Sequence, residues 1–375
     1  MSFELLGTII VRKSRLPIPK ALVYSSLKGS RLQLYIHLLS FVMSVALALS
    51  AEDYTVGWLC ALPKSELVAA IKMLDTKHPT LQLGDNDSNT YTYGSINRHN
   101  VVIACMPPGM PGPVSAQKLV QPLNKSFPNM RIHLFVGIGG GVPRNPVPQD
   151  PNKDVHLGDV VVGWAEETGA PSVVPWDFVR YYGEEKIESL GSLDKPDRRL
   201  LSALSVMLSD RELGEYAFHE HLTRLATLDN FAYPGLEKDK LYSPDFEHVD
   251  TDLNSTCDHC DPTRLAQREP RKKKEPVFHQ GTIASGSSVI KNARKRDEIS
   301  KKFNGALCIE MEAAGVMDDI RCLVIRGIAD YADSHKNGRW QNYAAATAAA
   351  FARQFLFTIQ PQVVKEIVKS SEFCP

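Results

Sequence analysis

The chain has 375 residues, of which 43% are apolar and 23% charged, as in a soluble globular protein with room for one large domain or two ordinary ones. The 43 Lys and Arg residues balance the 43 Asp and Glu residues, which argues against holding nucleic acid or an anionic membrane by bulk charge. The seven cysteines are odd in number and scattered, which excludes a disulfide framework and favours a reducing compartment.

The first fifty residues differ from the rest of the chain. Residues 34–49 form an apolar run without a formal charge, which resembles a signal-anchor or a late secretory signal. The run is shorter than the roughly 20 residues of a membrane span, and Met43 is a plausible start for a cytosolic protein. We expect residues 1–50 to be a misassigned or disordered extension, with a targeting segment or a packed helix as the alternatives.

From residue 53 onward the sequence alternates between two patterns. Runs rich in β-branched and aromatic residues predict strands, and apolar residues three or four apart predict helices. The expected strands are 54–60, 90–93, 101–106, 132–136 and 159–164, and the expected helices are 67–74 and 114–121. The segments 107–113 and 137–141 are rich in Gly and are expected to be loops. This alternation predicts a parallel or mixed sheet with helices on both faces.

Residues 183–275 interrupt the pattern with polar loops around helices predicted at 200–208 and 218–226. We interpret this segment as a large insertion, because the α/β pattern returns after it. The later strands are expected at 281–284, 307–311 and 322–328, and the later helices at 313–320 and 343–357. The sequence therefore predicts one domain over 53–360, followed by a tail at 361–375.

Four segments with chemistry-bearing residues stand at the ends of predicted strands, where open α/β sheets bind ligands. The glycines of 137–141 let backbone amides approach a ligand, although their spacing is not that of a dinucleotide fingerprint. A turn of small residues follows the strand at 281–284. Glu310 and Glu312 lie two apart, where like charges repel unless a donor or ligand faces them. Asp330 follows an apolar strand, as a helix N-cap or a catalytic acid would.

Each segment alone has a structural explanation, but together and in this order they resemble the purine nucleoside phosphorylase and nucleosidase superfamily. The resemblance is closest to the fungal branch found in NACHT and ankyrin immune-type receptors. The matching segments are DYTVGWLCALPKSELVAA (53–70), VGIGGGVP (136–143), LGDVVVG (157–163), YPGLEKDKLY (233–242), GTIASGSSVI (281–290), ALCIEMEAAGVM (306–317) and VIRGIADYADSHKNGRWQNYAAATAAAFA (324–352).

The resemblance implies a three-layer α/β/α fold around a twisted mixed sheet, and cleavage of the N-glycosidic bond of a purine nucleoside or nucleotide. Asp330 matches the acid that protonates the purine, and Glu66 matches a glutamate that activates the attacking water. The implied substrate-binding residues are Met311 and Glu312 on the ribose, Gly139 and Gly140 near the nucleophile, and Ser285, Gly286, Val289 and Ile290 against the base. Apart from the resemblance, Phe178 is a candidate for stacking on the base, with ordinary packing as the alternative.

The sequence departs from the family's pattern at several positions. Glu66 matches only if one extra residue is accommodated, and Ala329 stands where many relatives have Ser or Cys. Phe135 and Val136 precede the glycine run where the hexameric phosphorylases carry a phosphate-binding Arg. The missing phosphate clamp favours hydrolysis over phosphorolysis. A phosphate-dependent phosphorylase and a non-catalytic nucleotide-binding sensor are the alternatives.

The substrate is expected to be an adenine nucleoside or nucleotide. The resemblance makes ATP a candidate, with adenosine, inosine and methylthioadenosine-type nucleosides as alternatives. The cluster Lys291, Arg294, Lys295 and Arg296 would neutralise phosphates if it faced the pocket, and a solvated helix face is the other interpretation. We expect a cytosolic homo-oligomer that has no cofactor and binds neither nucleic acid nor membrane.

Two further segments have a structural and a functional interpretation. Cys257 and Cys260, with His248 or His259, are half of a zinc ligand set, but a single CxxC is weak and we prefer a loop with unpaired thiols. No metal is expected in catalysis. The basic run Arg271–Lys274 is expected to be a solvated loop.

Overall fold

The computed structural model describes residues 49–372, apart from 85–86, 165–169, 183–186, 190–192, 194, 250–255, 270, 272–274 and 318. The apolar run at 34–49 and the candidate start at Met43 therefore lie outside the described residues, except for Leu49. Ser50–Pro375 form one compact unit. None of the helices in the described part of the chain combines the length and the apolar character that crossing a bilayer requires.

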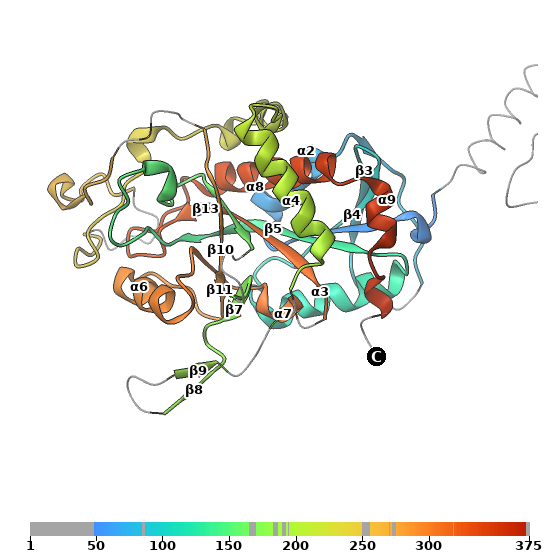
Figure 1. Cartoon of the computed structure of the whole chain (residues 1–375), viewed down its shortest axis with the longest axis horizontal. Coiled ribbons are helices and arrows are strands. Elements are labelled where there is room, and N and C mark those ends of the chain that lie inside the picture. Colours follow the sequence, from blue (N-terminus) through green and yellow to red (C-terminus); the bar gives the residue numbers. More distant parts are fainter. Residues whose placement is uncertain are drawn as a thin grey trace, which may run out of the picture. The chain divides into compact units, whose positions relative to one another are not determined.

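A mixed sheet runs through the middle of this unit (Figure 1). Its central strands are parallel and are, in spatial order, β13 (Cys322–Asp330), β5 (Ile132–Gly141), β1 (Val56–Cys60) and β4 (His99–Cys105). The edges are formed by β6 (Val160–Gly163) with β10 (Phe278–Gly281), and by β3 (Tyr91–Ile96) with β2 (Thr76–Lys77). The short strands that join beside the end of β5 are β12 (Cys308–Glu310), β11 (Ile283–Ser285) and β7 (Val173–Pro175).

Helices cover both faces of the sheet, which gives the three-layer α/β/α fold that was predicted (Figure 1). One face carries α8 (Gln341–Thr358), α2 (Val68–Met73), α4 (Arg198–Glu212) and α5 (Phe218–Thr223). The other carries α3 (Pro113–Ser126), α6 (Ala293–Lys302) and α7 (Ala314–Met317). The Ala-rich α8 packs directly on β13, where a Cβ at Gly327 would overlap the carbonyl oxygen of Ala344. Small residues on both elements therefore allow this close packing.

The glycine run at 137–141 was predicted to be a loop, and this prediction is wrong. The run is the last part of β5, which pairs there with β13 on one side and with β12 on the other, Gly140 opposite Ile309. A Cβ at Gly141 would lie 2.6 Å from a methyl carbon of Ile328. The glycines thus allow three strands to pack closely, and they do not form a turn.

A wide turn of π type, Pro63–Leu67, connects β1 to α2. The backbone N–H of Leu67 donates to the carbonyl of Leu62 at 3.1 Å, a spacing of five residues instead of the four of an α-helix. The turn directs the side chain of Glu66 into the protein, where it is 4% exposed.

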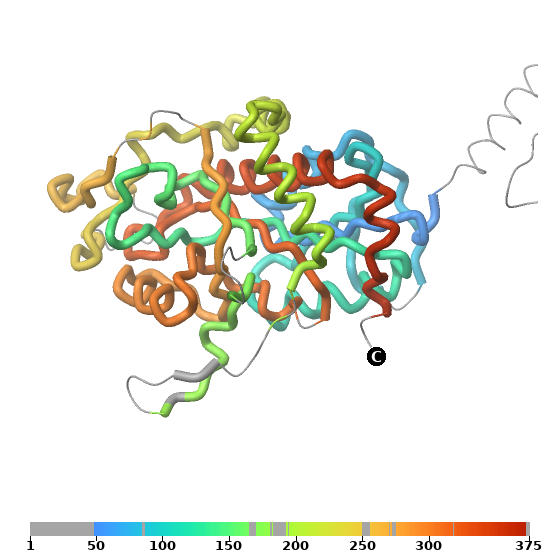
Figure 2. Tube along the Cα trace, viewed as in Figure 1, coloured from blue at the N-terminus to red at the C-terminus, as the bar shows by residue number. Residues whose placement is uncertain are grey.

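Helices of the segment 183–275 contribute to the core of the domain. Leu200 and Leu204 of α4 and Phe218 of α5 belong to the same buried cluster as Phe351 of α8. Both helices contact α8, and the trace in Figure 2 shows the yellow-green segment beside the red α8.

The prediction that the basic run Arg271–Lys274 is a solvated loop is wrong for Arg271. Its guanidinium is 6% exposed and donates to both carboxylate oxygens of the buried Asp159, at 2.5 and 2.6 Å. Arg268 likewise donates to Asp154 at 2.9 Å. These buried pairs fasten the end of the insertion to the connection between β5 and β6. The three lysines that follow Arg271 lie outside the described residues.

The described part of the predicted C-terminal tail packs against the domain. Helix α9 (Pro361–Glu366) buries Val364, and Ile367 is 3% exposed. The backbone N–H of Ser370 donates to the carbonyl of Met130 at 2.9 Å. Hydrogen bonding and apolar burial therefore hold this segment beside the start of β5.

Candidate active site

A cavity of about 190 Å³ opens at the carboxyl ends of the central strands, beside β12. This is the edge of an α/β sheet where ligands bind. Four carboxylates line it, from Glu66, Glu310, Glu312 and Asp330. Among the described residues that line it, Lys336 is the only cation. The cavity therefore brings together charged residues that are up to 270 positions apart in the sequence, and carboxylates predominate among them.

Three backbone N–H groups hold the carboxylate of Glu66. Its Oε2 accepts from Ala61 at 2.6 Å and from Leu62 at 2.9 Å, and its Oε1 accepts from Ile138 at 2.8 Å. Burial raises the pKa of Glu66, although Arg326 and these hydrogen bonds oppose the rise. The carboxylate is thus fixed in position and is a stronger base than an exposed glutamate.

Arg326 is a buried cation that the sequence analysis did not single out. Its Nη2 donates to Glu310 at 2.5 Å, and its guanidinium lies 4.3 Å from the ring centroid of Phe135. Its Nη1 lies near the Oε1 of Glu66, since each of these two atoms is 2.6 Å from the position of a Cβ at Gly137. A side chain at 137 would displace one of these two charged groups.

Glu310 is a structural partner of Arg326. Besides the arginine, its carboxylate accepts from the backbone N–H groups of Glu312 at 3.1 Å and Ala313 at 3.0 Å. Arg326 is therefore the donor that the neighbouring carboxylates of Glu310 and Glu312 require. Glu310 is bound to it, and the side chain of Glu312 is left for the cavity.

Glu312 faces the cavity beside the N-terminus of α3. Its Oε1 accepts from the backbone N–H of Gly112 at 3.3 Å, the residue that caps this helix. Burial, with a smaller contribution from the charge of Glu310, raises the pKa of Glu312 to about 7. The side chain therefore changes its charge near neutral pH.

We expect Glu312→Gln to stabilise the free protein at pH 8 and to have little effect near pH 4. The pKa of Glu312 is about 7 in the folded state and 4.5 ordinarily. Between these two pH values, the folded state therefore keeps a proton that the unfolded chain releases. The free energy of unfolding contributed by this group therefore falls as pH rises from about 4.5 to about 7, and stays lower above it. Thermal unfolding across pH measures the difference.

The control is Glu220→Gln, which changes an exposed carboxylate on α5 and should show no such pH-dependent gain. A lower melting temperature of Glu312→Gln at pH 8 would contradict the prediction.

Asp330 ends β13 with its side chain 6% exposed. Its Oδ1 accepts from the backbone N–H of Ala332 at 2.9 Å, and its Oδ2 lies 2.9 Å from the Nζ of Lys336. The carboxylate is thus held at the sheet edge by a backbone donor and a cation. Lys336 was not predicted as a site residue. The spacing between Asp330 and Lys336 in the sequence does not show that the loop connecting them brings the lysine back to the carboxylate.

Most of the predicted site residues line the cavity. Beside Glu66, Glu312 and Asp330, these are Gly139, Gly140, Val289, Ile290 and Met311. Ser285 and Gly286 are not lining residues. Ser285 is fully buried and its Oγ accepts from the backbone N–H of Ala314 at 2.9 Å, and a Cβ at Gly286 would contact the indole of Trp176. Their roles are to shape the turn.

Two other candidates for the site, each of which had an alternative interpretation, do not line the cavity. Phe178 is 58% exposed and is not a lining residue, so in this chain it does not stack in the cavity. The basic cluster at 291–296 is also absent from the lining. Arg296 is 2% exposed and donates to the carbonyl of Tyr331 at 3.0 Å, while Lys295 pairs with Glu298 at 3.1 Å. Arg296 therefore supports the loop that follows Asp330.

The chain is similar in sequence to several known proteins. The sequence pattern described as the Phosphorylase superfamily matches residues 55–357. A nucleotide-binding leucine-rich repeat (NLR)-like protein of Hyaloscypha variabilis is 39% identical over 321 residues, which cover 85% of this chain and 30% of that protein. The ATP nucleosidase Cap17 of Escherichia coli is 31% identical over 85 residues, 21% of this chain and 17% of that protein. The chain thus spans less than a third of these relatives.

Solved structures with low sequence identity share the fold. Futalosine hydrolase of Helicobacter pylori is 16% identical, with a TM-score of 0.51 over 83% of this chain and 100% of that chain. The 5′-methylthioadenosine/S-adenosylhomocysteine nucleosidase of the same organism is 16% identical, with a TM-score of 0.50 over 82% and 99%. The segment matched by the family pattern contains the sheet and every residue that lines the cavity. The chain therefore belongs to the phosphorylase superfamily.

Proposed function

We propose that the chain is a purine nucleosidase that hydrolyses the N-glycosidic bond of an adenine nucleoside or nucleotide. The observation that carries the proposal is that Glu66, Glu312 and Asp330 line one cavity and have different surroundings. Glycosidic cleavage passes through an oxocarbenium-like transition state, which needs an acid at the leaving group, a base for water and negative charge near the sugar. The three carboxylates supply one each.

Glu66 is assigned to the attacking water. Its Oε2 accepts two backbone hydrogen bonds and its Oε1 accepts one, so Oε1 still has a lone pair for a further donor. A water that donates to Glu66 gives up its proton to this carboxylate as its oxygen bonds to the anomeric carbon. The raised pKa of Glu66 makes this transfer easier, because a base is most effective when its pKa lies near the working pH.

Asp330 is assigned to the leaving base. Its proton goes to the purine five-membered ring, so the base departs neutral as the glycosidic bond breaks, and a pyrimidine has no acceptor at that place. Lys336, 2.9 Å from the other oxygen, stabilises the carboxylate that remains. Met311 and Glu312 are assigned to the ribose, where the ionised Glu312 accepts from the hydroxyl groups and faces the cation that forms on the sugar ring.

The charge of the cavity favours water over phosphate as the nucleophile. Four carboxylates and one lysine line it, and a phosphate dianion beside Glu66 would meet repulsion without a guanidinium or amide clamp of its own. A triphosphate substrate would have to extend its phosphates beyond these lining residues. The local similarity to the ATP nucleosidase of Escherichia coli supports testing ATP first. Cytosolic location and homo-oligomeric assembly stay predictions.

Chromatography of base release tests the proposal. The purified chain is incubated with ATP, adenosine, inosine and methylthioadenosine, each with and without phosphate. We expect free base without phosphate, and we expect Glu66→Gln to lower the rate by about 10²-fold, as loss of a general base does. Strict dependence on phosphate, with ribose 1-phosphate as product, would establish the phosphorylase instead. Tight adenine-nucleotide binding in calorimetry without any base release would establish the sensor.

A further inference from the structure

A cluster of thiol and imidazole groups lies outside the proposed catalytic machinery. Cys257 and Cys260 belong to one tight turn of the insertion, His248 precedes this turn, and His335 follows β13 by five residues. The ligand atoms of His248, Cys260 and His335 all lie within 4.8 Å of one another. The fold thus adds to the CxxC two histidines, one of which, His335, the sequence analysis did not associate with it.

The distances from His248 to the two cysteines fit the edges of a tetrahedral metal site. The Nδ1 of His248 lies 3.2 Å from the Sγ of Cys260 and 3.6 Å from the Sγ of Cys257. In a tetrahedral zinc site with ordinary bond lengths, a sulfur and a nitrogen ligand are about 3.5 Å apart. His248, Cys260 and His335 can therefore face a common central ion with small side-chain adjustments, whereas Cys257, which is not part of this mutually close group, has to turn its thiol toward the ion.

One member of the cluster points to a missing ligand. The Nε2 of His335 is buried and has no hydrogen-bond partner in the described part of the chain, an arrangement that is costly for a buried polar atom. The side chain is 7% exposed, and Tyr242 stacks on its ring at 4.1 Å between centroids. Cys257 and Cys260 are 3% and 5% exposed. Three of the four side chains are thus enclosed, and His248 is half-buried.

We propose that Cys257, Cys260, His248 and His335 bind a structural zinc ion. Two thiolates and two imidazoles are a ligand set that zinc prefers, and four protein ligands leave no open position for catalysis. A disulfide between the two cysteines would leave the buried Nε2 of His335 unexplained. The reducing compartment indicated by the cysteine usage is also one in which thiolates remain available to a metal.

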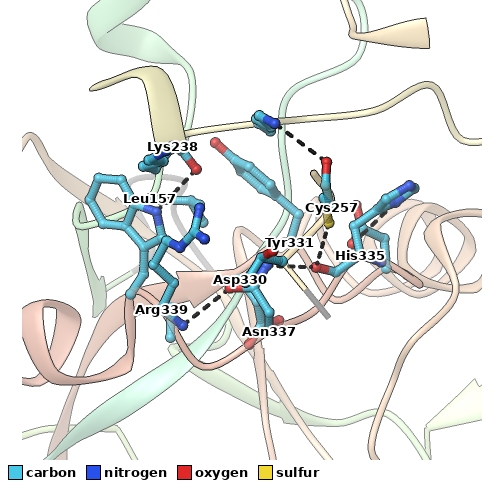
Figure 3. A pocket seen from close by; sticks show the side chains of 13 residues that line it. Leu157, Lys238, Cys257, Asp330, Tyr331, His335, Asn337 and Arg339 are labelled. Carbon is cyan, nitrogen blue, oxygen red and sulfur yellow. Dashed lines mark hydrogen bonds and ion pairs between the residues drawn. The ribbon is translucent and has the colours of Figure 1, made fainter. Parts of the chain in front are cut away.

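The zinc ion joins the insertion to the segment that positions the general acid. Figure 3 shows Cys257 and His335 in one pocket with Asp330 and Tyr331. Lys336, which contacts Asp330, directly follows His335. Binding of the metal therefore fixes the loop after β13 and, through Lys336, the carboxylate of Asp330. His335 and the two cysteines are positioning residues in this scheme, because they act on the active site only through the loop.

Metal content of the full chain, purified without a histidine tag, tests the zinc site independently of any nucleosidase activity. Mass spectrometry of metals is expected to find zinc close to equimolar with the chain. Cys260→Ser and His335→Asn should each lose most of it. His259→Asn changes the exposed histidine of the same turn and Cys105→Ser a thiol of β4, so both should keep it. Chelation of the wild-type chain should lower its melting temperature, since metal binding and folding are coupled.

If a variant fails to fold, cobalt substitution of the wild-type chain tests the metal site instead. Replacement of zinc by Co²⁺ should give the intense visible absorption of a tetrahedral thiolate site. Full zinc content in Cys260→Ser and in His335→Asn would overturn the proposal. So would a wild-type chain that holds a Cys257–Cys260 disulfide and no metal. Absence of base release together with bound zinc would contradict only the proposed function.

Discussion

Asp330→Asn is expected to lower kcat/KM for base release by about 10²-fold or more, as removal of a general acid does. The amide matches the carboxylate in shape and still accepts the backbone hydrogen bond from Ala332, but it has no proton to give to the purine. The loss should appear mainly in kcat, because it concerns a contact that matters most in the transition state.

A surface substitution serves as the control for this experiment. Asp245→Asn changes an exposed carboxylate that pairs with Arg264 and does not line the cavity, so it should leave the rate unchanged. Equal turnover of Asp330→Asn and the wild type on every substrate that is cleaved would remove Asp330 from the mechanism. Thermal unfolding of both variants separates a catalytic loss from a loss of folded protein.

Arg326→Met is expected to lower the free energy of unfolding by about 3–5 kcal/mol, the cost of removing one partner of a buried ion pair. The guanidinium is 1% exposed, and its removal leaves the carboxylate of Glu310 buried without its counter-charge. It also removes a charge that lowers the pKa of both Glu66 and Glu312. Urea denaturation of the variant measures the loss.

A double variant and a matched surface pair identify the origin of this effect. Arg326→Met combined with Glu310→Met should recover a large part of the loss, since no buried charge is then unpaired. Arg264→Met breaks an exposed pair with Asp245, whose partners are 41% and 53% exposed, and should cost no more than about 1 kcal/mol. Equal stability of Arg326→Met and Arg264→Met would refute the assigned role of Arg326.

The sequence predicted the order of strands and helices well, because hydrophobic periodicity reports directly on the face that an element buries. It failed where a segment's partner lies far away along the chain. The glycine run is a strand because β12, more than 160 residues later, pairs with it. Local composition carries no signal of that pairing.

The charged residues of the site show the same limit. Arg271 was expected in solvent, where most basic residues lie, and Arg296 was expected either in solvent or facing the pocket. Their acceptors, Asp159 and the carbonyl of Tyr331, come close only in the folded chain. Arg326 was missed for the same reason, although one signal was available. An arginine within an otherwise apolar predicted strand requires a buried acceptor, and Glu310 was a candidate for it.

The wide turn at Pro63–Leu67 bears on how this chain tolerates a change of length near Glu66. One additional residue in a regular helix would rotate everything after it by about 100° and turn the buried face of α2 toward solvent. A hydrogen bond that spans five residues takes up such a residue within a single turn. Ala69, Ala70 and Met73 therefore stay in the core, and Glu66 stays beside the glycines of β5. The wide turn therefore allows one additional residue between β1 and Glu66. Neither the buried face of α2 nor the position of Glu66 has to change.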